Sequence, residues 1–255
     1  MVTNTRLTPK RIIIGLARRV KHLVFLMFFP LLLLIVILIR IISPIYTIRL
    51  KVTVSSRLGH FSGEPDYYLN NKLFNPQPAR VLDVFGYCAE DVANHQLAKM
   101  WRRKMLFIPF LRHIDRVNKM FPGWERHVVP WNDVFGNKNH TFSDNTFLKF
   151  TAEEHKYGEK LLKEIIGSRS GPIVCVHNRD SVYLDKLHKY REWDYHDYRD
   201  SDIDNYILAM NWLAEQGYIV LRMGALVAKP IAGHHENVID YASSYRSDFM
   251  DIYLI

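Results

Sequence analysis

A charged tetrapeptide directly after a short apolar run is the part of this sequence best suited to chemistry. His177, Asn178, Arg179 and Asp180 follow Pro172–Val176, a run that predicts a buried β-strand. In open α/β sheets, ligands lie at the carboxyl ends of the strands. A guanidinium there presents a fixed fork of donors that suits a diphosphate, which makes Arg179 a candidate phosphate-binding residue. The alternative is a surface ion pair between Arg179 and Asp180, with His177 capping the strand.

A second arginine lies at the end of the next predicted strand. The segment from Ser201 to Gly217 predicts a helix with Ser201 as N-cap, and Tyr218–Gly224 is a second apolar run that carries Arg222. The right-handed crossover of such a βαβ unit brings Arg179 and Arg222 to one edge of a sheet. Two guanidinium groups at one edge predict a phosphorylated ligand between them. The alternative is that each arginine pairs with a nearby carboxylate, of which the candidates are Asp180, Asp197, Asp200 and Asp240.

Several short stretches together resemble a family of bacterial glycosyltransferases. The resemblance runs from about residue 50 to the end of the chain and depends on the number and order of the motifs. The matching stretches are Arg57–His60, Val92–Arg103, Val176–Leu184, Tyr195–Asp200, Arg222–Gly224, Val238–Ser244 and Arg246–Asp251.

This resemblance implies a fold and a set of roles. The family is similar to the two-domain GT-B transferases, and distantly to the fucosyltransferases that carry a His-x-Arg motif at the start of their donor domain. It implies an α/β chain with two Rossmann-like domains, in which Arg179 contacts the diphosphate of a nucleotide-sugar. We accordingly assign Arg179 and Arg222 to donor phosphate binding and Asp180 and His177 to catalysis, with no cofactor beyond the donor itself.

Other residues are candidates for binding by their position alone. A glycine turn after a predicted strand at residues 46–54 would deliver His60 to a cleft; the alternative, which the sequence favours, is a turn histidine without chemistry. The loop before Ser201 is rich in groups able to act as a base or to bind an anion. Later in the chain, a carboxylate after a strand suits a ribose, and a helix start suits phosphate. These further candidates are Asp197, Arg199, Asp240, Ser247 and Asp248.

Histidines occur close to one another in two parts of the chain. His188 and His196 with Asp197, or His234 with His235, could bind a metal ion, but neither group has a recognised ligand spacing. We therefore expect no metal site.

The N-terminal region predicts attachment to a membrane. Leu23–Ile39 is a run of 17 uncharged residues, long enough to cross a bilayer, and basic residues surround it. A simple span would place the following domain outside, away from cytosolic nucleotide-sugars. Pro30 is expected to break the helix into a re-entrant or in-plane segment, which keeps the domain on the cytoplasmic face of the bacterial inner membrane. A buried core helix is the alternative.

Composition fits an α/β protein that meets anionic partners. The chain has 255 residues, 48% of them hydrophobic, and a net charge of +8. Such a charge suits lipid headgroups or a phosphorylated substrate. It contains no recognised nucleic-acid module, so we expect no nucleic-acid partner. With Cys88 and Cys175 alone there is no disulfide framework, and Cys175 falls inside the predicted buried strand.

The chain divides into three predicted regions. Residues 1–45 form the basic N-terminus and membrane segment, 46–167 an N-terminal α/β domain on the acceptor side, and 168–255 part of a Rossmann-like donor domain. Because the chain stops inside its last predicted helix, we expect a truncated donor domain. The expected function is a membrane-associated transferase that moves sugar to a surface glycan or lipid-linked acceptor; the alternative is a noncatalytic membrane-anchored remnant.

Overall fold

The computed structural model of the protein describes residues 9–76, 78–135, 146–179, 182 and 198–255, with side chains in the first helix described from Arg19 onward. The chain is mixed α/β and forms two compact units. Residues 1–93 and 98–148 belong to the first unit, and residues 94–97 and 149–255 to the second. The sequence predicted a domain boundary between residues 167 and 168. In the structure, the helix that ends just before this boundary belongs to the second unit instead.

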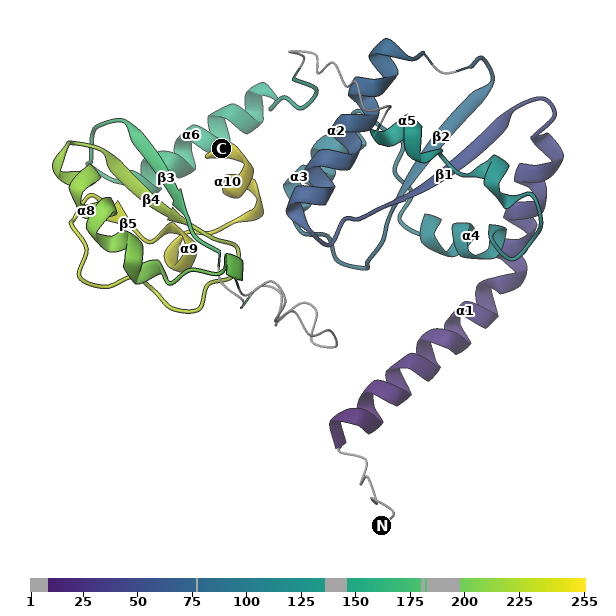
Figure 1. Ribbon diagram of the computed structural model, residues 1–255, viewed down its shortest axis with the longest axis horizontal. Helices are drawn as coiled ribbons and strands as arrows, with labels where there is room; N and C mark the ends of the chain where they lie inside the picture. The colour runs from purple at the N-terminus through teal and green to yellow at the C-terminus, as the bar shows by residue number, and fades with distance from the viewer. Residues whose placement is uncertain (1–8, 77, 136–145, 180–181, 183–197) are drawn as a thin grey trace. The chain divides into compact units, whose positions relative to one another are not determined.

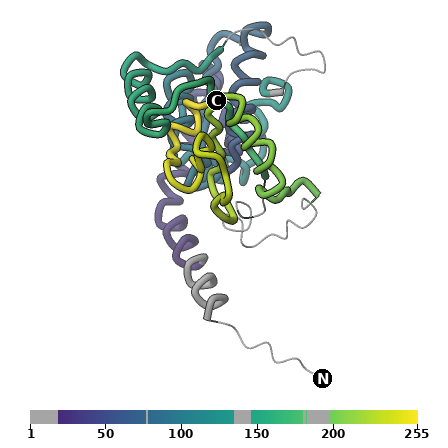
Figure 2. The backbone as a smooth tube through the Cα atoms, turned by 90° about the vertical axis from the view of Figure 1, so that its left-hand side faces the viewer, coloured from purple at the N-terminus to yellow at the C-terminus, as the bar shows by residue number. Residues whose placement is uncertain are grey.

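The first unit begins with the long apolar helix α1, Pro9–Ile42. Residues Arg19–Ile42 are long and apolar enough to cross a membrane. The predicted break at Pro30 is wrong, because α1 is one continuous helix (Figures 1 and 2). Proline removes one backbone hydrogen bond, at a cost of about 3 kcal/mol. A break would expose several more backbone groups in an apolar segment, where each is costly.

Among the described residues, two parallel strands form the sheet of the first unit. β1 (Thr47–Thr53) pairs with β2 (Val81–Tyr87), in a register that places Arg49 opposite Asp83. β1 agrees with the strand predicted at residues 46–54. The helical elements of this unit are α2 (Leu58–Phe74), residues 98–102 of α3 (His95–Arg102), α4 (Leu111–Asn118), the 3-10 helix η1 (Trp124–His127) and α5 (Trp131–Phe135).

Helix α1 supplies part of the core of the first unit. Phe25, Leu32, Val36 and Ile39 recur along one stripe of the helix and are buried. They pack with Leu50 of β1, Val84 of β2 and three residues of α4, namely Leu111, Ile114 and Val117. The opposite stripe of α1 is exposed, from Leu23 and Met27 to Ile41.

The second unit is built on a parallel sheet whose strand order is β3-β4-β5 in the described residues. The strands are β3 (Ile173–His177), β4 (Ile219–Met223) and β5 (Val238–Ile239). The helical elements are α6 (Ala152–Ile166), η3 (Ile203–Tyr206), α8 (Ile207–Glu215), α9 (Tyr241–Ser244) and α10 (Asp248–Tyr253).

Strand β4 is buried on both faces. Ile219, Leu221 and Met223 point into a core shared with α6, α9 and α10. Val220 points into a second core that contains Met210 of α8. Successive side chains of a strand alternate between faces, so β4 is the middle of a three-layer arrangement.

One local prediction is correct and two are wrong. Thr151 and Glu154 form a capping box at the start of α6, as the Thr-x-x-Glu spacing predicts. The N-cap predicted at Ser201 is wrong, because Asp202 accepts a hydrogen bond from the backbone of Asp204 and η3 begins there. The prediction that Cys175 is buried is also wrong. β3 pairs with β4 along one side, and its alternate residues, including Cys175, are exposed.

Candidate functional site

The strand ends of the second unit bring together the residues on which the sequence argument depends. Val176 of β3 is the register partner of Arg222 of β4, and the two strands run parallel. His177 ends β3 with an exposed side chain, and Asn178 and Arg179 follow it. The expected common edge is therefore present. Arg179 lies beyond that edge in a loop, whereas Arg222 lies within its strand.

Arg179 is held by the segment that precedes η3. Its Nε lies 3.1 Å from a carboxylate oxygen of Asp200, and its carbonyl accepts a 2.8 Å hydrogen bond from the backbone of Ser201. The buried amide of Asn178 donates to the Ser201 carbonyl at 2.9 Å. The Arg179 side chain keeps 32% of its exposure. Arg179 is therefore paired with a carboxylate and remains partly exposed to solvent.

Arg222 has a different environment, because its side chain is completely buried. One terminal nitrogen lies 3.0 Å from Asp240 and the other donates to the Lys229 carbonyl at 3.3 Å. Asp240 also accepts a hydrogen bond from the backbone of Ile231 at 3.1 Å. Burial opposes ionisation of this carboxyl, but hydrogen bonds from Ser243, Ile231 and Arg222 together hold the pKa of Asp240 below its ordinary value. Both arginines thus pair with carboxylates named in the alternative interpretation.

The start of α10 is occupied by its own side chains. Ser247 is the N-cap and accepts a hydrogen bond from the backbone of Met250. Asp248 accepts from the backbone of His95 at 2.7 Å and pairs with Arg246 at 2.6 Å. Arg246 also pairs with Asp251. In this arrangement Ser247 and Asp248 fasten α10, with no open donor set for a phosphate.

Of the remaining sequence candidates, the structure describes Arg199 and His60. Arg199 is exposed and donates to the hydroxyl of Tyr198 at 2.8 Å. His60 belongs to the first unit. It lies in the first turn of helix α2 and not in the predicted glycine turn, and its Nδ1 lies 3.6 Å from a carboxylate oxygen of Glu64. Asp180 and Asp197 lie outside the described residues, as do His188 and His196.

A polar network that the sequence argument missed joins the strands of the first unit. Arg49 makes two hydrogen bonds to Asp83, at 2.6 and 2.8 Å, and a further ion pair with Asp133. The hydroxyl of Tyr68 donates to the same Asp83 at 2.7 Å. Burial lowers the pKa of the Arg49 guanidinium, but the carboxylates of Asp83 and Asp133 outweigh this effect and raise it above its ordinary value. The register of β1 and β2, which no local pattern fixes, was needed to find this pair.

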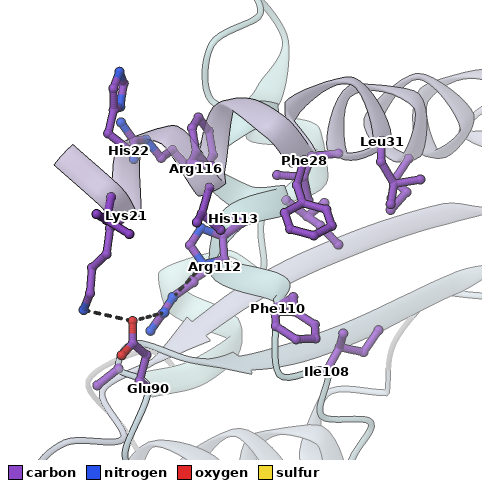
Figure 3. Close-up of a pocket in the computed structure, with 17 residues that line it drawn as sticks. Lys21, His22, Phe28, Leu31, Glu90, Ile108, Phe110, Arg112, His113 and Arg116 are labelled. Carbon is purple, nitrogen blue, oxygen red and sulfur yellow. Dashed lines mark hydrogen bonds and ion pairs between the residues drawn. The ribbon is translucent and has the colours of Figure 1, made fainter. Parts of the chain in front are cut away.

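A groove of about 1200 Å³ lies in the first unit between α1 and α4. Figure 3 shows Phe28 and Leu31 of α1 facing Phe110 and Ile108 across it. The groove wall is mostly apolar. Its rim carries charged and titratable side chains, which are Lys21, His22, Glu90, Arg112, His113 and Arg116.

The charges on this rim are predominantly positive. Glu90 lies 3.1 Å from Lys21 and 3.3 Å from Arg112 (Figure 3). The guanidinium of Arg116 lies 4.5 Å from the ring centroid of Phe25. Burial first, and then the charges of Arg112 and Arg116, lower the pKa of His113, while Glu90 acts in the opposite direction. The rim thus presents an excess of cations beside an apolar wall.

Comparison of the chain with family models, with characterised proteins and with solved structures gave no match. The class that the described residues define is therefore an α/β protein with parallel sheets and an N-terminal apolar helix.

Proposed function

We propose that this chain is a membrane-attached glycosyltransferase that moves a sugar from a nucleotide donor to a surface glycan or lipid-linked acceptor. The observation that carries the proposal is the position of Arg179. This partly exposed guanidinium lies just beyond the carboxyl end of a strand in a parallel sheet. Ligands of open α/β sheets bind at that edge, and a guanidinium suits a diphosphate.

Each residue then has a distinct role. Arg179 binds the donor diphosphate, and Asp200 orients its guanidinium through the 3.1 Å ion pair. His177 ends the same strand and Asp180 follows it in the sequence; these two residues supply the catalytic base. The base takes the proton from the acceptor hydroxyl while the new glycosidic bond forms and the diphosphate leaves. Arg222, which is buried against Asp240, positions β4 and contacts no donor in this arrangement.

Binding of a nucleotide-sugar tests this proposal directly. The full chain in a neutral detergent should bind one or more members of a panel of nucleotide-sugars. Binding should saturate, because each chain has a single site for the diphosphate. The corresponding nucleoside diphosphate should compete, whereas the nucleoside should not. Calorimetric titration measures this. If the heats show no saturation as the donor concentration rises, for every donor of the panel, the transferase proposal is refuted.

A second function is favoured by one specific observation. Arg179 and Arg222 already have carboxylate partners, Asp200 and Asp240, without any ligand. Ion pairs of this kind need no substrate to explain them, so a noncatalytic membrane-attached protein is the competing function. The same titration separates the two, because this second function predicts no saturable binding of any nucleotide-sugar.

The packing of α1 bears on how the protein meets the membrane. Leu32 and Val36, near the middle of the apolar segment, pack against the sheet residues Leu50 and Val84. A helix that crossed the bilayer would carry this sheet, with Arg49 beside Leu50, to hydrocarbon depth. Each charged residue there costs about 3 kcal/mol, and sheet edges do not occur in lipid. We therefore propose that α1 lies along the membrane surface on its exposed stripe, with the domain on the cytoplasmic side.

Cysteine labelling tests this attachment. In a variant with Cys88→Ser and Cys175→Ser, single cysteines at Thr5 and at Ser62 should react with a membrane-impermeant maleimide from the same side of sealed inside-out vesicles. An in-plane helix keeps both ends on one side, whereas a crossing helix separates them. Labelling of the two positions from opposite sides would overturn the in-plane arrangement and leave a simple span.

A further inference from the structure

The groove between α1 and α4 combines features of a lipid-binding site. Its apolar wall includes Phe28 and Leu31 from the helix that we propose lies on the membrane, and Ile108 and Phe110 from the segment leading into α4. An apolar slot that adjoins an exposed apolar helix stripe is open to hydrocarbon chains.

The rim of the groove selects the headgroup. Lys21, Arg112 and Arg116 contribute three positive charges, and Glu90 contributes one negative charge. Within the part of the chain that the structure describes, Arg116 makes no ion pair, and its guanidinium lies over the Phe25 ring. A guanidinium held beside an apolar wall is a strong donor to phosphate oxygens. The excess of positive charge therefore favours an anionic headgroup over a zwitterionic one.

We propose that this groove binds one anionic membrane lipid, with its phosphate headgroup at Arg116, Arg112 and Lys21 and its hydrocarbon chains along Phe28 and Leu31. The inference rests on the proposed membrane attachment and requires no sugar transfer. It also assigns a role to Glu90, which holds Lys21 and Arg112 in the absence of lipid and competes with the phosphate for them.

Binding to the full chain in neutral detergent tests the proposal, with native mass spectrometry as the readout. The probe is dioleoyl phosphatidic acid. Dioleoyl phosphatidylcholine tests the headgroup charge, dioleoylglycerol tests the chains alone, and inorganic phosphate tests the anion alone. We expect phosphatidic acid to bind more tightly than all three. Equal binding of phosphatidic acid and phosphatidylcholine would mean nonselective lipid contact, and equal binding of inorganic phosphate would mean a simple anion site; either result overturns the proposal.

Charge variants sharpen the test. Arg116→Gln should weaken phosphatidic acid binding about fivefold, which corresponds to the loss of one cation near a lipid phosphate. Glu90→Gln should strengthen it by a similar factor of about five, because Lys21 and Arg112 lose their competing partner. A role of these residues in folding alone does not predict a gain of affinity.

The matched control is Lys119→Gln. Lys119 directly follows helix α4 as its C-cap and carries the same charge, but it pairs with Asp115 at 2.7 Å and does not line the groove. This variant should bind phosphatidic acid like the wild type. Equal loss in Arg116→Gln and Lys119→Gln, or no gain in Glu90→Gln, would refute the groove as the site. Since none of these measurements involves a nucleotide-sugar, failure here is separate from failure of the transferase proposal.

Discussion

Arg222→Ala is expected to destabilise the second unit by about 3–5 kcal/mol, because it leaves the Asp240 carboxylate inside the fold without its charge partner. The Arg222 side chain is completely buried, and that of Asp240 retains 10% of its exposure. Domains of this size have about 5–15 kcal/mol in total, so the change removes a large fraction of the stability of the second unit. Chemical denaturation followed by circular dichroism measures the loss.

Two further variants separate lost pairing from lost volume. Arg222→Met combined with Asp240→Asn removes both charges and should recover part of the stability, since no buried charge is left alone. Arg199→Ala, at an exposed arginine that contacts Tyr198, should change the stability by less than about 0.5 kcal/mol. An Arg222→Ala protein as stable as Arg199→Ala would contradict a structural role for the pair.

The pair also predicts how stability depends on pH. The pKa of Asp240 is lowered in the folded protein, so its contribution is fully present above the pKa of the unfolded chain, near 4. The contribution is lost as the pH falls through the folded pKa below that value. The difference in stability between the wild type and Arg222→Ala should therefore narrow in this acidic range.

Arg179→Ala is expected to lower transferase turnover about 100-fold or more while leaving the fold intact. Removal of one positioned donor to a developing negative charge typically costs this much. The ion pair to Asp200 is partly exposed and contributes at most about 1 kcal/mol to stability. Turnover is measured as nucleoside diphosphate released in the presence of membranes that supply the acceptor, and stability is followed by thermal unfolding.

Arg179→Lys and Arg199→Ala complete this test. Lysine keeps the charge but loses the planar fork, so its turnover should lie between the wild type and Arg179→Ala. Arg199→Ala tests the neighbouring arginine that the sequence also offered as a binding candidate. In the proposed arrangement its guanidinium donates to Tyr198 and has no role in donor binding, so this variant should turn over normally. Unchanged turnover in Arg179→Ala would remove Arg179 from the site while leaving its ion pair with Asp200 as its only role.

Local patterns in the sequence predicted the parts of the fold that local interactions decide. The alternation at residues 46–54 indicated β1, and the Thr151 to Glu154 spacing indicated the start of α6. The βαβ crossover correctly placed β3 and β4 side by side and parallel. Each of these signals depends on residues a few positions apart or on a general rule of chain handedness.

Features that depend on distant contacts could not be predicted in this way. Whether Arg222 faces a ligand or the interior depends on Asp240 and Lys229, which follow it in the chain and meet it only in the fold. The groove could not be predicted from local patterns, because its two walls come from α1 and α4, which are far apart in the sequence. The helix break predicted at Pro30 was wrong because the cost of a proline is a local effect. The continuity of α1 is supported by the core of the first unit, against which residues on both sides of Pro30 pack.

The double role of α1 has a consequence for how the protein is made. Phe25, Leu32, Val36 and Ile39 complete the core of the first unit, and burial of such side chains contributes about 1.5–3 kcal/mol each as an upper estimate. Their sum is comparable to the whole stability of a domain. A version shortened to begin after this helix, the usual route to a water-soluble form, would therefore lack part of its own interior. With the proposed membrane attachment, the helix partitions between lipid and the nascent domain during synthesis, and maturation of the first unit is then coupled to arrival at the bilayer.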